Sequence, residues 1–144
     1  MIYVNSITAA LTGILSADAA LVSSGFSVQE GEALNRDLHL TPWVGVYHGH
    51  LAVAPLTVGG DAPWQGNVEL ILYVQEGSHL SGQDANRRLN MAQGAVLDVL
   101  RQNPTLNGAV LAWLGLEIAP FRRDLVDDTW LFTNEIVLKA QVRA

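Results

Sequence analysis

Residues 68–75 form the best strand pattern in the chain, and the best helix pattern follows it directly. The strand pattern alternates and its second face is only partly polar, so we expect a central strand that is covered on both sides. The helix pattern begins at Ser81, with Asp84 three residues on as in a capping box, and it ends before Pro104. A chain with this pair must pack a helix layer against a sheet layer. The strand residues are Val68, Leu70, Leu72 and Val74 on one face and Glu69, Ile71, Tyr73 and Gln75 on the other.

Further periodic segments complete a single domain over residues 1–144. Apolar residues at helical spacing predict a helix from Ile7 to Leu15, with Asn5 or Ser6 as its N-cap and a short turn at 16–21. Strands are expected at 26–29, 43–47, 109–118 and 129–143. This order, without regular alternation of strand and helix, predicts an α+β fold. We expect a mainly antiparallel or mixed sheet with two helices packed on one face.

The connection between residues 49 and 66 is rich in glycine and proline and yet apolar, so it is a long apolar loop or an extended hairpin. Trp113 and Trp130 lie in strand patterns and are expected in the core. For Trp64, inside the connection, a core position and an interface position both remain open. The interface hypothesis treats the connection as an arm whose contact residues are Leu51, Val53, Leu56, Val58 and Trp64.

The composition favours self-association. Of the 144 residues, 49% are hydrophobic and only 15% are charged, whereas soluble domains carry about 25% charged residues. Because one small core cannot bury all of this apolar surface, part of it is expected to face another copy. The chain has no cysteine, no apolar run long enough to span a bilayer and no basic leader at its start, so we expect no membrane partner and assembly in a cytoplasm.

The net charge of −6 argues against a nucleic-acid binder, which needs basic residues to neutralise phosphates. The charge is also uneven: residues 1–86 hold one basic residue, Arg36, against eight acids, and residues 87–144 hold seven basic residues against six acids. Two explanations of this distribution remain open. One is chance, and the other is a subunit with one acidic surface and one nearly neutral surface.

Candidate chemistry is sparse. His48 and His50 would point the same way on a strand, but a metal site needs a third ligand, and only Asp37, His39, Asp61 or His79 are available. The alternative is a polar strand end beside Gly49. The acids at 124, 127 and 128 are typical of a solvated turn, and Ser23, Ser24 and Ser78 lie in no nucleophile motif. No phosphate-binding glycine motif occurs. We therefore expect no enzyme, no cofactor and no metal.

The layout of the segments resembles the tail terminator family of long-tailed bacteriophages, also called tail completion or minor tail proteins. The likeness covers nearly the whole chain and is one of layout and hydrophobic spacing rather than of invariant residues. The 49–66 connection departs from any fixed pattern. The segments that carry the likeness are Leu-Ser-Ala-Asp-Ala-Ala-Leu (15–21), Pro-Trp-Val-Gly-Val-Tyr (42–47), Val-Leu-Asp-Val-Leu (96–100), Asn-Pro-Thr-Leu-Asn-Gly-Ala-Val (103–110) and Glu-Ile-Val-Leu-Lys-Ala-Gln-Val (135–142).

The resemblance implies a structural virion protein at the head-proximal end of a tail. Such a subunit forms a homo-oligomeric ring, hexameric in the resembled family, on the last ring of tail tube protein. The ring ends tube growth and offers a joining surface to the head-side connector or neck protein, and no catalytic residue is implied. DNA would pass through without specific binding, and acids would keep it from adhering. The expected channel acids are Glu30, Glu32, Asp37 and Glu69, with Asp61 and Glu76 as further members of the same group.

Two other functions stay open at this stage. One is a neck or head–tail joining protein of a phage or phage-like particle, since related folds serve several positions along the neck and tail. The other is a small ligand-binding, metal-binding or hydrolytic α+β domain that uses His48 and His50.

Overall fold

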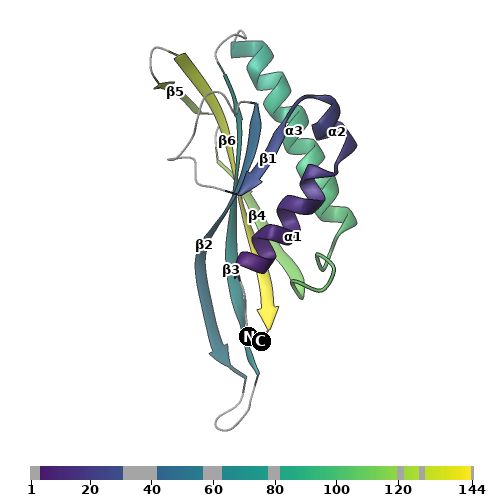
Figure 1. Cartoon of the computed structure of the whole chain (residues 1–144). Helices are drawn as coiled ribbons and strands as arrows, with labels where there is room; N and C mark the ends of the chain where they lie inside the picture. The colour runs from purple at the N-terminus through teal and green to yellow at the C-terminus, as the bar shows by residue number, and fades with distance from the viewer. Residues whose placement is uncertain are drawn as a thin grey trace.

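The computed structural model describes residues 4–30, 42–56, 63–77, 82–119, 122–126 and 129–143. Within these residues, three helices lie on one face of a six-stranded mixed sheet, which confirms the predicted α+β class (Figure 1). None of the helices in the described part of the chain is long and apolar enough to cross a membrane. The elements are α1 (Val4–Ser16), α2 (Ala19–Ser23), β1 (Ser27–Glu30), β2 (Trp43–Pro55), β3 (Trp64–Glu76), α3 (Gly82–Gln102), β4 (Ala112–Ile118), β5 (Arg122–Val126) and β6 (Thr129–Arg143).

The strands follow the order β1-β2-β3-β6-β4, and β5 pairs with the first residues of β6. The β1–β2 pairing is parallel, and the other four pairings among the described strands are antiparallel. The strand predicted at 68–75 is the middle of β3, between β2 and β6, so its central position is confirmed. β4 and β5 share the other edge of β6, and together they form one border of the sheet.

The core lies between the helices and one face of the sheet, called here the helix-side face. The apolar stripes of α1 and α3 face this core, as the helical spacing at 7–15 and 85–100 predicts, with α1 over β1 and β2 and α3 over β3 and β6. The prediction that β3 is covered on both sides holds only at its end, where Gln75 on the second face is buried beside Trp43. Farther back, Glu69, Ile71 and Tyr73 on that face are only half-buried. The helix-side core residues of β3, α1 and α3 are Val68, Leu70, Leu72, Val74, Ile7, Leu11, Leu15, Ala85, Leu89, Ala92 and Val96.

The turn predicted at 16–21 is the start of α2. The Asp18 carboxylate accepts a hydrogen bond from the backbone N–H of Leu21 at 3.1 Å, which satisfies a donor that the first helical turn leaves open. Leu21 is fully buried, so this short helix is fixed to the core by one side chain. Ser81, the cap predicted for α3, lies outside the described residues.

The apolar connection at 49–66 is the distal part of a hairpin made by β2 and β3. Their antiparallel pairing runs from Trp43 opposite Gln75 to Pro55 opposite Trp64, with one register shift between His48 and Leu51. In Figure 1 the hairpin extends beyond the ends of the helices. The extended hairpin, one of the two predicted forms of this segment, is thus the observed one.

A tight turn carries the chain from α3 back to β4. Leu106, Asn107 and Gly108 follow one another with positive φ angles of 51°, 55° and 88°. Left-handed backbone at a leucine costs about 1 kcal/mol, whereas burial of a leucine side chain gains about 2 kcal/mol. Because the Leu106 side chain is buried at 1% exposure, burial outweighs the strain. The Trp113 indole N–H closes the turn by donating to the Asn103 carbonyl at 3.0 Å.

Residues 122–126 form a strand, so the prediction of a solvated turn around Asp124 is wrong. Cross-strand pairing with β6, from Arg122 opposite Thr133 to Val126 opposite Thr129, holds this charged segment extended. Arg122 Nε lies 3.0 Å from Asp124 Oδ2, two residues along the same side of the strand. Asp127 and Asp128 lie outside the described residues.

Candidate assembly surfaces

Exposed large apolar side chains gather in two places among the described residues. One is the distal hairpin, called here the arm and made of residues 51–56 and 63–67. The other is the sheet border formed by β4, β5 and the start of β6. Isolated exposed apolar residues are ordinary, but grouped ones mark surfaces that bind a partner. The exposed residues are Leu51, Leu56 and Trp64 on the arm and Leu111, Leu114, Leu116, Ile118, Leu125 and Trp130 along the border.

The arm is a two-stranded ribbon whose backbones approach unusually closely. A Cβ placed on Gly66 would lie 1.9 Å from the carbonyl oxygen of Ala52, so only glycine fits there without movement of the backbone. Leu56 N–H closes the described end of the ribbon by donating to the Pro63 carbonyl at 2.9 Å. The neighbouring strand β6 reaches the arm through Arg143, which donates to Gln65 Oε1 at 2.9 Å.

Three of the five predicted arm contacts are exposed: Leu51, Leu56 and Trp64. Val53 is half-buried and packs against the core, and Val58 lies outside the described residues. Trp64 is 48% exposed, and the register that pairs it with Pro55 places it four pairs beyond Leu51 and Val68. Since side chains of a strand alternate, Trp64 and Leu51 share the helix-side face with buried Val68.

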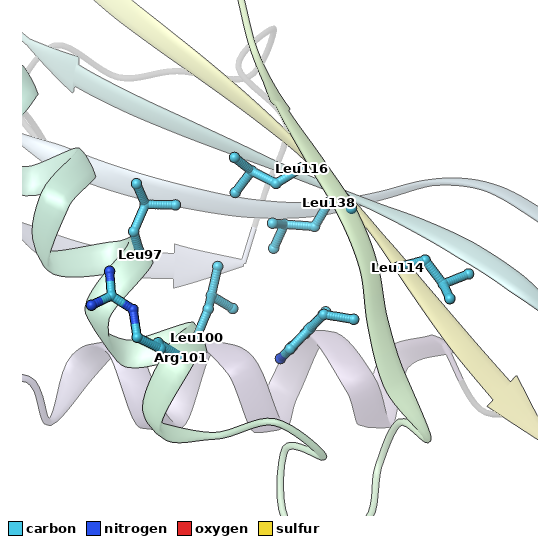
Figure 2. A pocket seen from close by; sticks show the side chains of 8 residues that line it. Leu97, Leu100, Arg101, Leu114, Leu116 and Leu138 are labelled. Carbon is cyan, nitrogen blue, oxygen red and sulfur yellow. The ribbon is translucent and has the colours of Figure 1, made fainter.

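The second surface contains an apolar groove of about 310 Å³ between α3 and β4 (Figure 2). This α3–β4 groove exists because α3 packs over β3 and β6, and β4 is one strand farther out. Leu116 stands opposite Leu138 in the pairing, so both are on the helix-side face, but only Leu138 is covered. The lining residues are Leu97, Leu100, Arg101, Trp113, Leu114, Gly115, Leu116 and Leu138.

Sequence reasoning missed the groove because it treated residues 109–118 as an ordinary apolar strand. β4 is exposed over most of its length, and Leu114 at 50% and Leu116 at 38% exposure are its most accessible groove residues. A signal was present in the sequence: two helices cannot cover a sheet this wide, so one apolar strand at the end of the order had to stay open.

The border continues into the β5–β6 hairpin, where the prediction that Trp130 belongs to the core is wrong. Trp130 is 42% exposed and stands opposite Leu125, which is 58% exposed. The guanidinium of Arg123 lies 4.7 Å from the centroid of the Trp130 ring, a cation–π distance. Trp113, the other tryptophan expected in the core, is half-buried against it.

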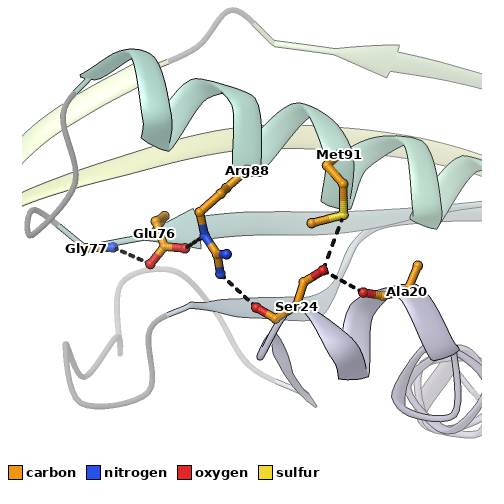
Figure 3. A network of polar contacts seen from close by, with 6 residues as sticks. All are labelled: Ala20, Ser24, Glu76, Gly77, Arg88 and Met91. Atoms are coloured by element: carbon orange, nitrogen blue, oxygen red, sulfur yellow. Dashed lines mark hydrogen bonds and ion pairs between the residues drawn. The ribbon is translucent and has the colours of Figure 1, made fainter.

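One buried polar network holds three elements together near the α3 N-terminus (Figure 3). Arg88 of α3 pairs with Glu76 at the end of β3, with 2.7 Å between Nε and Oε2, and donates to the Ser24 carbonyl at 2.7 Å. Its guanidinium also lies 5.3 Å from the ring centroid of Phe26. Glu76 is fully buried, so the expectation that it lines a channel is wrong.

The two other channel acids among the described residues, Glu30 and Glu69, do not share one face of the sheet. Glu30 is exposed at the end of β1 opposite Val46, a helix-side core residue, whereas Glu69 is on the opposite face of the sheet, across from Lys139. Glu32, Asp37 and Asp61 lie outside the described residues.

No catalytic or metal-binding cluster is assembled in the described ranges. No three histidine, cysteine, aspartate or glutamate side chains come together there as metal ligands. His48 and His50 are exposed on β2, where His48 stacks on Tyr47 at 5.1 Å between ring centroids. The possible third ligands (Asp37, His39, Asp61 and His79) fall outside the described residues. The hydroxyls of Ser23 and Ser24 donate to the Ala20 carbonyl at the end of α2.

Comparison with known proteins gives a likeness of fold. Neither a family model nor a curated protein matches the sequence. Among solved structures, the chain is similar to a chain of the virion of a native gene transfer agent particle, with a TM-score of 0.53 and 18% sequence identity. The match covers 96% of this chain and 95% of the other, so the two proteins share a fold from end to end.

Proposed function

We propose that this chain is a structural subunit of a phage-like virion. The observation that carries the proposal is the fold shared along 96% of the chain with a component of a gene transfer agent virion. The two apolar surfaces support it, because a virion subunit must bind copies of itself and of other virion proteins. The low proportion of charged residues, 15%, agrees with a chain that is largely covered after assembly.

Within the virion we propose the position of tail terminator: a ring, hexameric in the resembled family, that caps the last ring of tail tube protein. The support is the whole-chain layout together with the arm and the groove, which lie on opposite edges of the sheet. A closed ring uses two different patches of each subunit, one for each neighbour. The head-side connector would bind the free face of this ring.

The function is tested by mixing the purified protein with tail tube protein and imaging the product by negative stain. Rings seated on one end of otherwise open tubes, together with tubes of limited length, are the expected result. Rings that bind connector protein but leave tubes growing would replace the terminator position by a neck position. A protein that stays monomeric at micromolar concentration with either partner would refute the virion role.

The acidic channel is a separate proposal that now rests on two residues. Glu30 and Glu69 lie on opposite faces of the sheet, so one face of the ring wall can present only one of them to DNA. The test compares DNA delivery by particles assembled from a Glu30→Gln variant with delivery by particles assembled from a Glu69→Gln variant. The variant with altered delivery identifies the acid that faces DNA. Unchanged delivery by both variants contradicts the acidic channel.

A further inference from the structure

We propose that the arm of one copy binds the α3–β4 groove of a second copy, with Trp64 and Leu51 as the side chains that enter it. This inference rests on the proposed function only in that the chain acts as an assembled subunit. It adds the two surfaces that meet and the direction of the contact.

The groove matches the arm in chemistry. Apart from Arg101, its lining side chains are apolar. Its volume of about 310 Å³ is large enough for an indole. The described arm residues, 51–56 and 63–67, carry no charged side chain, so none of them repels Arg101. Binding removes exposed leucines of both surfaces from water.

The backbones match as well. In the described residues, β4 pairs with β6 on one side, and its other edge has open N–H and C=O groups. Among the described residues, β1 pairs with β2 only as far as Val46, so no described strand covers the outer edge of β2 along the arm. Two open edges can join as neighbouring strands, a recurrent mode of protein association. With the helix-side faces aligned, the arm's β2 runs antiparallel to β4 of the neighbouring copy.

The arm of a copy cannot fill its own groove. The outer edges of β2 and β4 are opposite borders of one sheet, with β3 and β6 between them. The occupant must then be the arm of another molecule. Because each copy offers one arm and one groove, the contact is head-to-tail, and it closes into a ring or continues as a filament.

The test uses two variants that each break one side of the contact. Trp64→Ser damages the arm and keeps the groove, and Leu114→Ser/Leu116→Ser damages the groove and keeps the arm. All three side chains are at least 38% exposed, so urea unfolding midpoints near that of the unmodified protein are expected. Each variant alone should associate about tenfold more weakly or worse, measured by native mass and sedimentation. Val22→Ser, at an exposed position of α2 outside both surfaces, is the matched control.

The decisive measurement is the mixture of the two variants. One intact arm and one intact groove then remain between them, so a 1:1 heterodimer that does not grow further is expected. Unweakened association of either variant, or a mixture that stays monomeric, overturns the proposal. A two-fold pairing of β4 with β4 is the main competitor, and it predicts that Trp64→Ser still forms homodimers.

The failure of this inference is distinguishable from failure of the proposed function. If the unmodified protein caps tubes but the mixed variants form no heterodimer, the function stands and the arm–groove contact is wrong. If heterodimers form but no ring ever binds a tube, the contact stands and the terminator position is wrong.

Discussion

Arg88 Nε lies 2.7 Å from Oε2 of Glu76, whose side chain has no exposed surface. A buried carboxylate is tolerated only when charge and hydrogen bonds compensate for the lost water. Gly77 N–H donates to the other oxygen, Oε1, at 3.2 Å, and Arg88 also reaches the Ser24 carbonyl. The pair thus fixes the end of β3, the first half of α3 and the end of α2 to one another.

Replacement of Arg88 by methionine should be among the most destabilising changes at a partly exposed position. The change leaves the Glu76 carboxylate buried without its guanidinium partner. We expect the free energy of unfolding to fall by about 3 kcal/mol. The loss is at the lower end for a buried pair because Arg88 is one-third exposed, so water can partly replace it. Urea denaturation measures the loss. Arg87→Met is the matched control, because its partner Asp84 is largely exposed and the pair should contribute less than about 1 kcal/mol. Equal effects of the two variants would contradict a special role for the buried pair.

Trp113→Phe should loosen the turn between α3 and β4. The phenyl ring fills most of the indole site, but the Asn103 carbonyl loses its donor at 3.0 Å. A loss of about 1 kcal/mol is expected from the missing hydrogen bond. Hydrogen exchange locates the effect: faster exchange in residues 103–110 with unchanged exchange in β3 is the expected pattern. Uniform acceleration across the sheet would instead show a global loss of packing.

The sequence predicted those elements in which local pattern and burial agree. β3 alternates and is central, α3 has a clean stripe and a proline stop, and both were placed within a few residues of their observed bounds. The same reasoning failed for β5, because Arg122, Arg123 and Asp124 have no strand-like side chains. Their extended form comes from pairing with β6, a contact distant from any local preference.

The candidate site was only half predictable. Gly/Pro content and apolar side chains identified the arm, and Trp64 was already open to an interface role. The groove was not identified, because it depends on which strands the helices leave uncovered. That depends on strand order, which local periodicity does not predict. Trp130 shows the same limit: its alternation with Phe132 suggests the core, but only Phe132 lies where α3 and β3 cover the sheet.

The histidine pair should bind zinc no better than a surface imidazole pair. His48 and His50 are exposed, and two imidazoles fall short of the three or four protein ligands of zinc sites. Equimolar Zn²⁺ should therefore shift the thermal midpoint of the unmodified protein no more than that of a His48→Ala/His50→Ala variant. A stoichiometric metal retained through dialysis, and lost in the double variant, would restore the metal-binding function.

Gly66→Ala tests whether the shape of the arm matters for assembly. The added Cβ would lie 1.9 Å from the Ala52 carbonyl oxygen and 2.6 Å from Val53 Cα, both backbone atoms of the facing strand. The ribbon must open at this pair, so the positions of Leu51 and Trp64 relative to each other should change. We expect self-association to fall about tenfold or more, while the helices and the core of β3 keep their native circular dichroism.

Gly94→Ala is the control for adding the same methyl group elsewhere. Gly94 lies within α3, and nothing stands within 4 Å of the position of its new Cβ. Alanine is the better helix former by about 1 kcal/mol, so this variant should unfold at higher urea and assemble normally. The pair separates two explanations of a Gly66→Ala defect. If Gly94→Ala assembles and Gly66→Ala does not, the geometry of the arm is responsible. If Gly66→Ala assembles like the unmodified protein, the arm does not need its close backbone contact to bind a neighbour.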